Sequence, residues 1–143
     1  MRGVGGSSAF RQVAGSPLGT GILLAATGLI TWVGLSIWGG IAGDGAFRLR
    51  EAWDLSAYLY VGMPVMALAV AFAAFVRPER VWRWPLWLVG GHQVGVLVTG
   101  IGMQSAPSLL ILTIVLAVLL AAGFTIPAML GAMAARAMEE RAY

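Results

Sequence analysis

The chain has 143 residues, about the length of one domain, with 59% hydrophobic residues, only 10% charged residues and a formal net charge of +3. A soluble domain carries about 25% charged residues, and one this small could not cover so much apolar surface. The composition therefore excludes a soluble monomer, a disordered tail and a polar nucleic-acid-binding module. It predicts a single all-α transmembrane domain over residues 1–143.

Two absences narrow the class of protein further. Cysteine is missing, so the chain has no disulfide, no thiolate metal site and no thiol nucleophile. Lysine is also missing, and every basic residue is an arginine. In a membrane protein a small arginine excess indicates orientation and contact with anionic headgroups, so we expect the lipid bilayer as a partner and no nucleic acid.

Long charge-free stretches predict four membrane-spanning helices. The run 84–135 has no charged residue, and at about 1.5 Å per residue it is far longer than a bilayer core of about 30 Å. We therefore expect this run to fold back at 102–108, where Gly, Gln, Ser and Pro gather. The predicted helices cover about 18–38, 55–76, 85–101 and 107–134.

Local signals support these helix ends. Asp54 precedes the second helix and can cap its free amides, while Pro85 and Pro107 open the third and fourth helices. Pro127 lies near the end of the fourth helix, where we expect it to kink the helix or end its regular part. Residues 45–53 have the pattern of a short interfacial helix on the outer surface.

Arginine placement predicts the orientation of the bundle. Seven of the nine arginines lie in the N-terminal segment, the second loop and the C-terminal tail, and two lie in the first loop. Cytoplasmic loops carry the excess of basic residues, so we expect both termini in the cytoplasm and a multi-pass protein of the cell inner membrane. The two helical hairpins differ in loop length and composition, and we find no internal repeat.

His92 is the only histidine and the one side chain of the predicted helices that titrates near neutral pH. An ionisable group inside a membrane is a functional candidate, which makes His92 a candidate haem or cofactor ligand or a proton-handling group. The alternative is a neutral imidazole hydrogen-bonded to a neighbouring helix. We expect this alternative, with no cofactor and no metal. The chain has no second histidine, and the soft donors Met63 and Met66 are predicted at a different depth.

Small residues recur every four positions on the third and fourth predicted helices. This spacing places them on one helix face and lets two backbones approach closely in lipid. Both stripes predict helix–helix contacts, inside the bundle or between protomers. They consist of Gly91, Gly95 and Thr99 on the third helix, and of Gly123, Pro127, Gly131 and Ala135 on the fourth.

The second loop alternates arginine with tryptophan at the level predicted for the lipid headgroups. Indole rings fit the aromatic belt of a membrane protein, and guanidinium groups pair with anionic phosphates. A partner-docking loop is the alternative interpretation. The predicted lipid-headgroup anchors at the cytoplasmic face are Arg80, Trp82, Arg83, Trp84 and Trp87.

From Arg50 to Pro85 the chain resembles small uncharacterised four-helix inner-membrane proteins of bacteria. The shared pattern is an acidic outer loop, Arg50-Glu51-Ala52-Trp53-Asp54, followed by a proline-containing helix and an Arg/Trp inner loop. This resemblance implies a fold and a location but no activity. Small multidrug transporters need a carboxylate in the first helix, and small fluoride channels need asparagine in their pore; this chain has neither.

These features favour a non-catalytic accessory, assembly or structural subunit, whose partners are other membrane subunits or a second copy. The chain shows no paired acid–base or nucleophile–base set, so we expect no enzyme. One alternative is a haem- or cofactor-binding membrane protein that uses His92. The other is a small oligomeric channel or transporter, with a pore lined by Thr27, Thr31, Ser36, Gln93, Thr99, Gln104 and Thr113.

Overall fold

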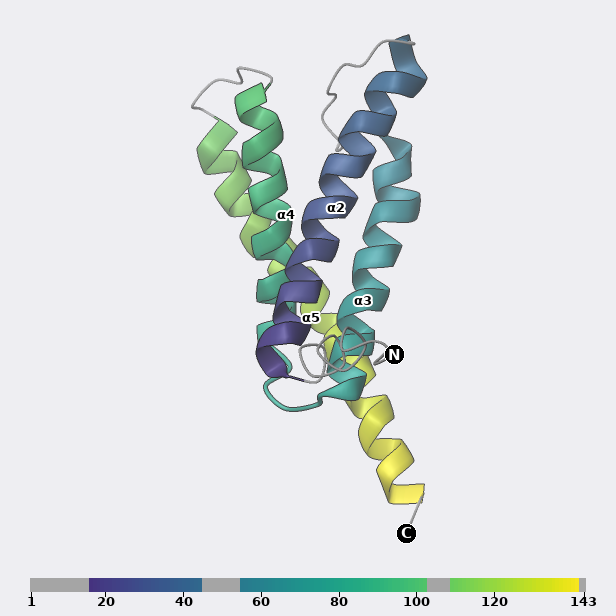
Figure 1. The fold of residues 1–143 in the computed structure, drawn as a ribbon. Helices are drawn as coiled ribbons and strands as arrows, with labels where there is room; N and C mark the ends of the chain where they lie inside the picture. The colour runs from purple at the N-terminus through teal and green to yellow at the C-terminus, as the bar shows by residue number, and fades with distance from the viewer. Residues whose placement is uncertain (1–15, 45–54, 103–108, 142–143) are drawn as a thin grey trace, which may run out of the picture.

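The computed structural model describes residues 16–44, 55–102 and 109–141, and it is built from helices (Figure 1). No strand occurs in these three ranges, which confirms the predicted all-α class. The elements in chain order are α2 (Pro17–Asp44), the π-helical turn η2 (Tyr58–Gly62), α3 (Met63–Val76), α4 (Arg83–Gly102) and α5 (Leu109–Arg141).

Three stretches of the described chain are long and apolar enough to cross a membrane: Pro17–Ala42, Tyr58–Val76 and Thr113–Arg141. Helix α4, which corresponds to the third predicted span and carries Arg83, His92 and Gln93, is not one of them. Its 20 residues still extend about 30 Å, the thickness of a bilayer core. Large apolar side chains cover much of the outer surface, as lipid requires.

Helices that run in the same direction form the closest pairs. Helix α2 packs mainly against α4, and α3 packs mainly against α5, whereas consecutive helices share smaller contacts. In Figure 1 the chain runs along α2 and α4 away from one end of the bundle, and along α3 and α5 back to it. The beginning of α2 and the end of α5 therefore lie at the same end. The two hairpins also lie side by side with equivalent helices in contact, despite their different loops.

Two glycines permit the close approach of α2 and α4. A Cβ atom at Gly28 would overlap the carbonyl oxygen of Leu88, and a Cβ atom at Gly91 would overlap the carbonyl oxygen of Ala25. The contact is reciprocal, since each helix presents a glycine to the backbone of the other. In lipid such a fit is a main source of helix association, because the tails are as apolar as the side chains.

The core of the bundle lies where the two helix pairs meet. Each helix contributes apolar side chains that are almost completely buried. They fill the space between the helices at the close packing typical of protein interiors. Its members include Leu24, Trp32, Met66, Val70, Leu88, Phe124 and Ala128.

The helix ends differ from the predicted ones in three places. Helix α2 continues to Asp44 instead of ending near 38, and α4 begins at Arg83, which places Pro85 inside its first turn, where no amide hydrogen is needed. Helix α5, described from Leu109, passes through Pro127 to Arg141 instead of ending near 134, so the proline does not end it. The expectations for Asp54, Gln104, Pro107 and the interfacial helix at 45–53 fall outside the described residues.

Candidate functional site

Four polar or aromatic side chains meet inside the bundle, and we call them the buried cluster: Trp32, Tyr58, His92 and Thr99. They come from α2, η2 and α4, and none is more than 2% exposed. Residues far apart in the sequence thus share one interior position. Two side-chain hydrogen bonds within this cluster cross between helices.

The first link of the buried cluster joins His92 to the second span. The hydroxyl oxygen of Tyr58 lies 2.9 Å from Nε2 of His92. With the imidazole proton on Nδ1, the hydroxyl donates to Nε2; with the proton on Nε2, the ring donates to the hydroxyl. The hydrogen bond of His92 to a neighbouring helix, which the sequence led us to expect, is confirmed.

The second link joins α2 to α4. The indole Nε1–H of Trp32 donates to Oγ1 of Thr99 over 2.8 Å, and this hydroxyl donates in turn to backbone carbonyls of its own helix, 3.0 Å from Gly95 and 3.1 Å from Val96. The Trp32 ring also stands edge-on to two other members of the cluster, with ring centroids 4.9 Å from His92 and 5.8 Å from Tyr58. Trp32 is therefore the centre of the cluster.

Local sequence explains how Tyr58 reaches this position. Pro64 has no amide hydrogen, and in an α-helix its ring would collide with the carbonyl four residues earlier. The turn η2 widens the helix just before this proline, and the N–H of Met63 donates to the carbonyl oxygen of Tyr58 five residues earlier. Such π-turns are frequent at functional positions in helices.

The sequence analysis placed Met63 and Met66 at a different depth from His92, but it did not anticipate that Tyr58, which precedes Met63, reaches that histidine. This contact depends on the relative tilt and offset of the helices, which the periodicity of one helix does not give. Trp32 and Tyr58 were missed for the same reason: each is an ordinary aromatic residue within an apolar stretch, and only its neighbours make it part of a site.

The buried cluster has no free approach to the bonded nitrogen of His92. An iron or metal ion at Nε2 would occupy the position of the Tyr58 hydroxyl. Among the described residues no three His, Asp or Glu side chains are placed to hold a metal ion. Haem ligation by His92 stays the alternative interpretation, and ligation through Nε2 requires Tyr58 to move.

The glycine stripes have different surroundings in the structure. Gly95 faces the Trp32 ring, at 3.1 Å from the position of its missing Cβ, and Thr99 bonds the same indole. On α5, a Cβ at Gly131 would overlap the carbonyl oxygen of Ala71 on α3. Gly123, by contrast, has no atom within 4 Å of its Cβ position, so it makes no close contact inside the chain.

The residues expected to line a pore do not share one surface. Ser36 and Thr99 are completely buried inside the protomer, so they are not available to a pore between protomers. The Thr27 hydroxyl donates to the carbonyl oxygen of Leu23 on its own helix. Within the described chain the Ser36 hydroxyl and the Gln93 amide have no hydrogen-bond partner, which lowers the stability of the isolated bundle.

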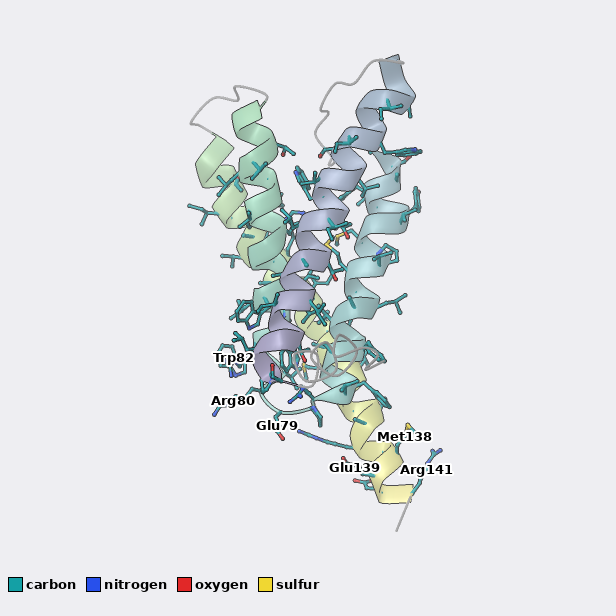
Figure 2. All side chains as sticks on the ribbon, viewed as in Figure 1. Glu79, Arg80, Trp82, Met138, Glu139 and Arg141 are labelled. Atoms are coloured by element: carbon teal, nitrogen blue, oxygen red, sulfur yellow. The ribbon has the colours of Figure 1, made fainter. Side chains whose placement is uncertain are left out.

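Some of the predicted headgroup anchors are exposed on the surface of the bundle, and one is buried inside it. Figure 2 shows Arg80 and Trp82 projecting outward near the beginning of α2 and α4. Trp84 does not face the headgroups: it is 4% exposed, and its Nε1–H donates to the carbonyl oxygen of Arg77 at 3.1 Å. Trp82 lies in the turn before α4, whereas Trp84 lies in the first turn of the helix, so the two side chains take different directions.

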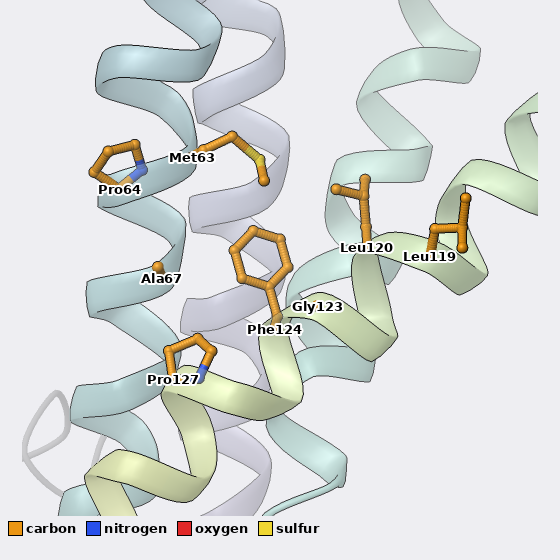
Figure 3. Close-up of a pocket in the computed structure, with 8 residues that line it drawn as sticks. All are labelled: Met63, Pro64, Ala67, Leu119, Leu120, Gly123, Phe124 and Pro127. Carbon is orange, nitrogen blue, oxygen red and sulfur yellow. The ribbon is translucent and has the colours of Figure 1, made fainter.

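An apolar groove runs between α3 and α5 (Figure 3). Its volume is about 410 Å³, and Phe124 of α5 projects across it towards α3. The open position beside Gly123 belongs to this groove. The other lining residues are Met63, Pro64, Ala67, Leu119, Leu120 and Pro127.

The fold and these features define a helical protein with three segments able to cross a membrane. Comparison of the chain with family models, with curated proteins and with solved structures gives no match.

Proposed function

We propose that this chain is a non-catalytic integral membrane protein that serves as an accessory, assembly or structural subunit of a membrane complex or of a homo-oligomer. The proposal rests on how the bundle uses its buried polar groups. Tyr58 bonds His92, and Trp32 bonds Thr99, so these groups hold helices together. None of the four is exposed enough to meet a substrate.

The groove between α3 and α5 supports an association role. Lipid provides no hydrophobic drive for helix association, so partners are held by close van der Waals fit and by small residues. Gly123 leaves an open position in an otherwise apolar surface, into which a side chain of another helix fits. We propose that a helix of another membrane subunit, or of a second copy, packs there.

The orientation belongs to the same proposal. The four helices cross the inner membrane of the cell together, with α4 shielded on one side by α2. Both termini lie in the cytoplasm, because the arginine-rich segments favour that side.

Site-directed crosslinking in native membranes tests this function. The chain has no cysteine, so Gly123→Cys introduces a single thiol into the groove. Gly100→Cys is the matched control, because its Cβ position is also open but lies outside the groove. We expect one discrete adduct from Gly123→Cys, identified by mass spectrometry as another subunit or a second copy, and no such adduct from the control. Equal labelling at both positions without a discrete adduct contradicts the proposal.

A further inference from the structure

Two pockets meet at Arg83, near the beginning of α2 and α4. The smaller pocket has a volume of about 180 Å³ and a charged lining formed by Arg77, Glu79, Arg80 and Arg83, with Pro17 and Trp84. The larger is an apolar groove of about 670 Å³ along α4. Arg83 lines both, so the charged pocket and the apolar groove are adjacent at this residue.

The smaller pocket has the charge of an anion site. Three guanidinium groups face a single carboxylate, that of Glu79. No carboxylate of the described chain forms an ion pair with Arg80 or Arg83, so both retain donors for a ligand. Guanidinium groups match phosphate oxygens in geometry as well as in charge.

The backbone conformation at Arg80 is a second indication of a ligand site. Its φ angle is 51°, and it is the one non-glycine residue of the described chain with a positive φ. Residues other than glycine rarely adopt this left-handed backbone conformation. Where they do, the position is often a site that clamps a ligand. Arg83 follows on the next turn, where its N–H donates to the carbonyl oxygen of Arg80 over 2.9 Å.

The larger pocket has the shape of a chain-binding groove. Its lining begins at Trp82, just before α4, and follows one face of the helix past Leu86 and Gly90 to Val94. From Arg83 to Val94 the groove extends about 17 Å along the helix, slightly more than one half of a hydrocarbon core of about 30 Å. No atom lies within 4 Å of the Cβ position of Gly90, so this residue keeps the groove open.

We propose that the two pockets form one binding site for an anionic phospholipid. The phosphate lies among Arg77, Arg80 and Arg83, and an acyl chain follows the groove beside Gly90. The charged pocket and the apolar groove adjoin at Arg83, just as the headgroup and the acyl chains of a phospholipid are joined to each other. A free phosphate would fill only the charged pocket, and a helix of a partner would fill only the apolar groove.

Quenching of tryptophan fluorescence tests the site on the full-length protein in detergent. Phosphatidylglycerol and phosphatidylcholine, each brominated on the acyl chains, are titrated separately. We expect phosphatidylglycerol to bind more tightly than phosphatidylcholine. Arg80→Gln and Arg83→Gln should each weaken the binding of phosphatidylglycerol about fivefold and leave the binding of phosphatidylcholine unchanged. Glu79→Gln removes the opposing charge and should strengthen phosphatidylglycerol binding.

Variants at two open glycines test the groove. Gly90→Leu fills the groove and should weaken the binding of both lipids. Gly100→Leu, at an open position of the same helix outside the groove, should change the binding of neither. Unchanged thermal stability of both variants shows that the fold is retained.

Three outcomes would overturn the proposal. Equal binding of the two lipids, with no effect of the arginine variants, would leave only a non-specific lipid layer. Displacement of phosphatidylglycerol by inorganic phosphate, with no effect of Gly90→Leu, would indicate a free-anion site. Loss of a copurifying protein in Gly90→Leu, without any change in lipid binding, would indicate that a partner helix occupies the groove.

Discussion

The Tyr58 hydroxyl lies 2.9 Å from Nε2 of His92, and this hydrogen bond connects the second span to α4 in the interior of the bundle. Trp32 of α2 stands edge-on to both rings. Three helices are thus held at one level by side chains from three separate stretches of sequence. The bond gives the buried imidazole of His92 a polar partner inside an apolar bundle.

Substitutions at His92 should distinguish a packing role from a ligand role. We expect His92→Gln to be tolerated, because its amide also donates and accepts. His92→Leu and Tyr58→Phe should each lower the free energy of unfolding in detergent by about 1 kcal/mol, and the double variant should lose less than the sum. A Soret band in the wild-type protein that disappears in His92→Gln would instead make His92 a haem ligand.

Thr99 should stabilise the bundle through its hydroxyl. Thr99→Val keeps the shape but removes the acceptor of the Trp32 N–H, and we expect a loss of about 1 kcal/mol in the free energy of unfolding. Thr27→Val is the matched control, because the Thr27 hydroxyl bonds only the carbonyl of Leu23 on its own exposed turn. Equal effects of both substitutions would show that the bond between α2 and α4 adds nothing.

Two adjacent glycines of α4 should respond in opposite ways to alanine. Gly91→Ala places a methyl group against the backbone of Ala25, so we expect a loss of about 1–3 kcal/mol through forced separation of α2 and α4. Gly90→Ala places the same methyl group in open space and should be neutral or stabilising. The two variants are compared by unfolding in detergent. Similar stability of both would mean that α2 and α4 do not touch at Gly91.

The orientation is checked with reporter fusions. A reporter attached after Tyr143 should be active only if it works in the cytoplasm, because the seven arginines of the termini and the second loop favour that side. A second fusion in the first loop, after Asp44, should show the opposite activity. Activity of a periplasm-dependent reporter at Tyr143 would contradict the proposed cytoplasmic location of the C-terminus.

Composition and charge spacing by themselves determined the fold class and the apolar segments. A run such as 84–135 exceeds the thickness of a bilayer and has to turn back, and this constraint acts on the chain whatever its neighbours are. The helix termini were less well determined. Hydrophobicity stops being informative where a helix leaves the apolar layer, so the continuation of α5 to Arg141 was not predicted.

Only the tertiary structure decided which residues form the site. The stripe spacing identified Gly91 as a packing residue, but not Gly28 as its counterpart, and it did not separate Gly131 in a contact from Gly123 in a groove. Likewise, Trp82 and Trp84 are equivalent in sequence, yet one faces outward and the other is buried. The reason is physical: contacts between helices depend on their relative rotation, tilt and axial offset. These are set by the packing of all helices together and not by the periodicity of any one.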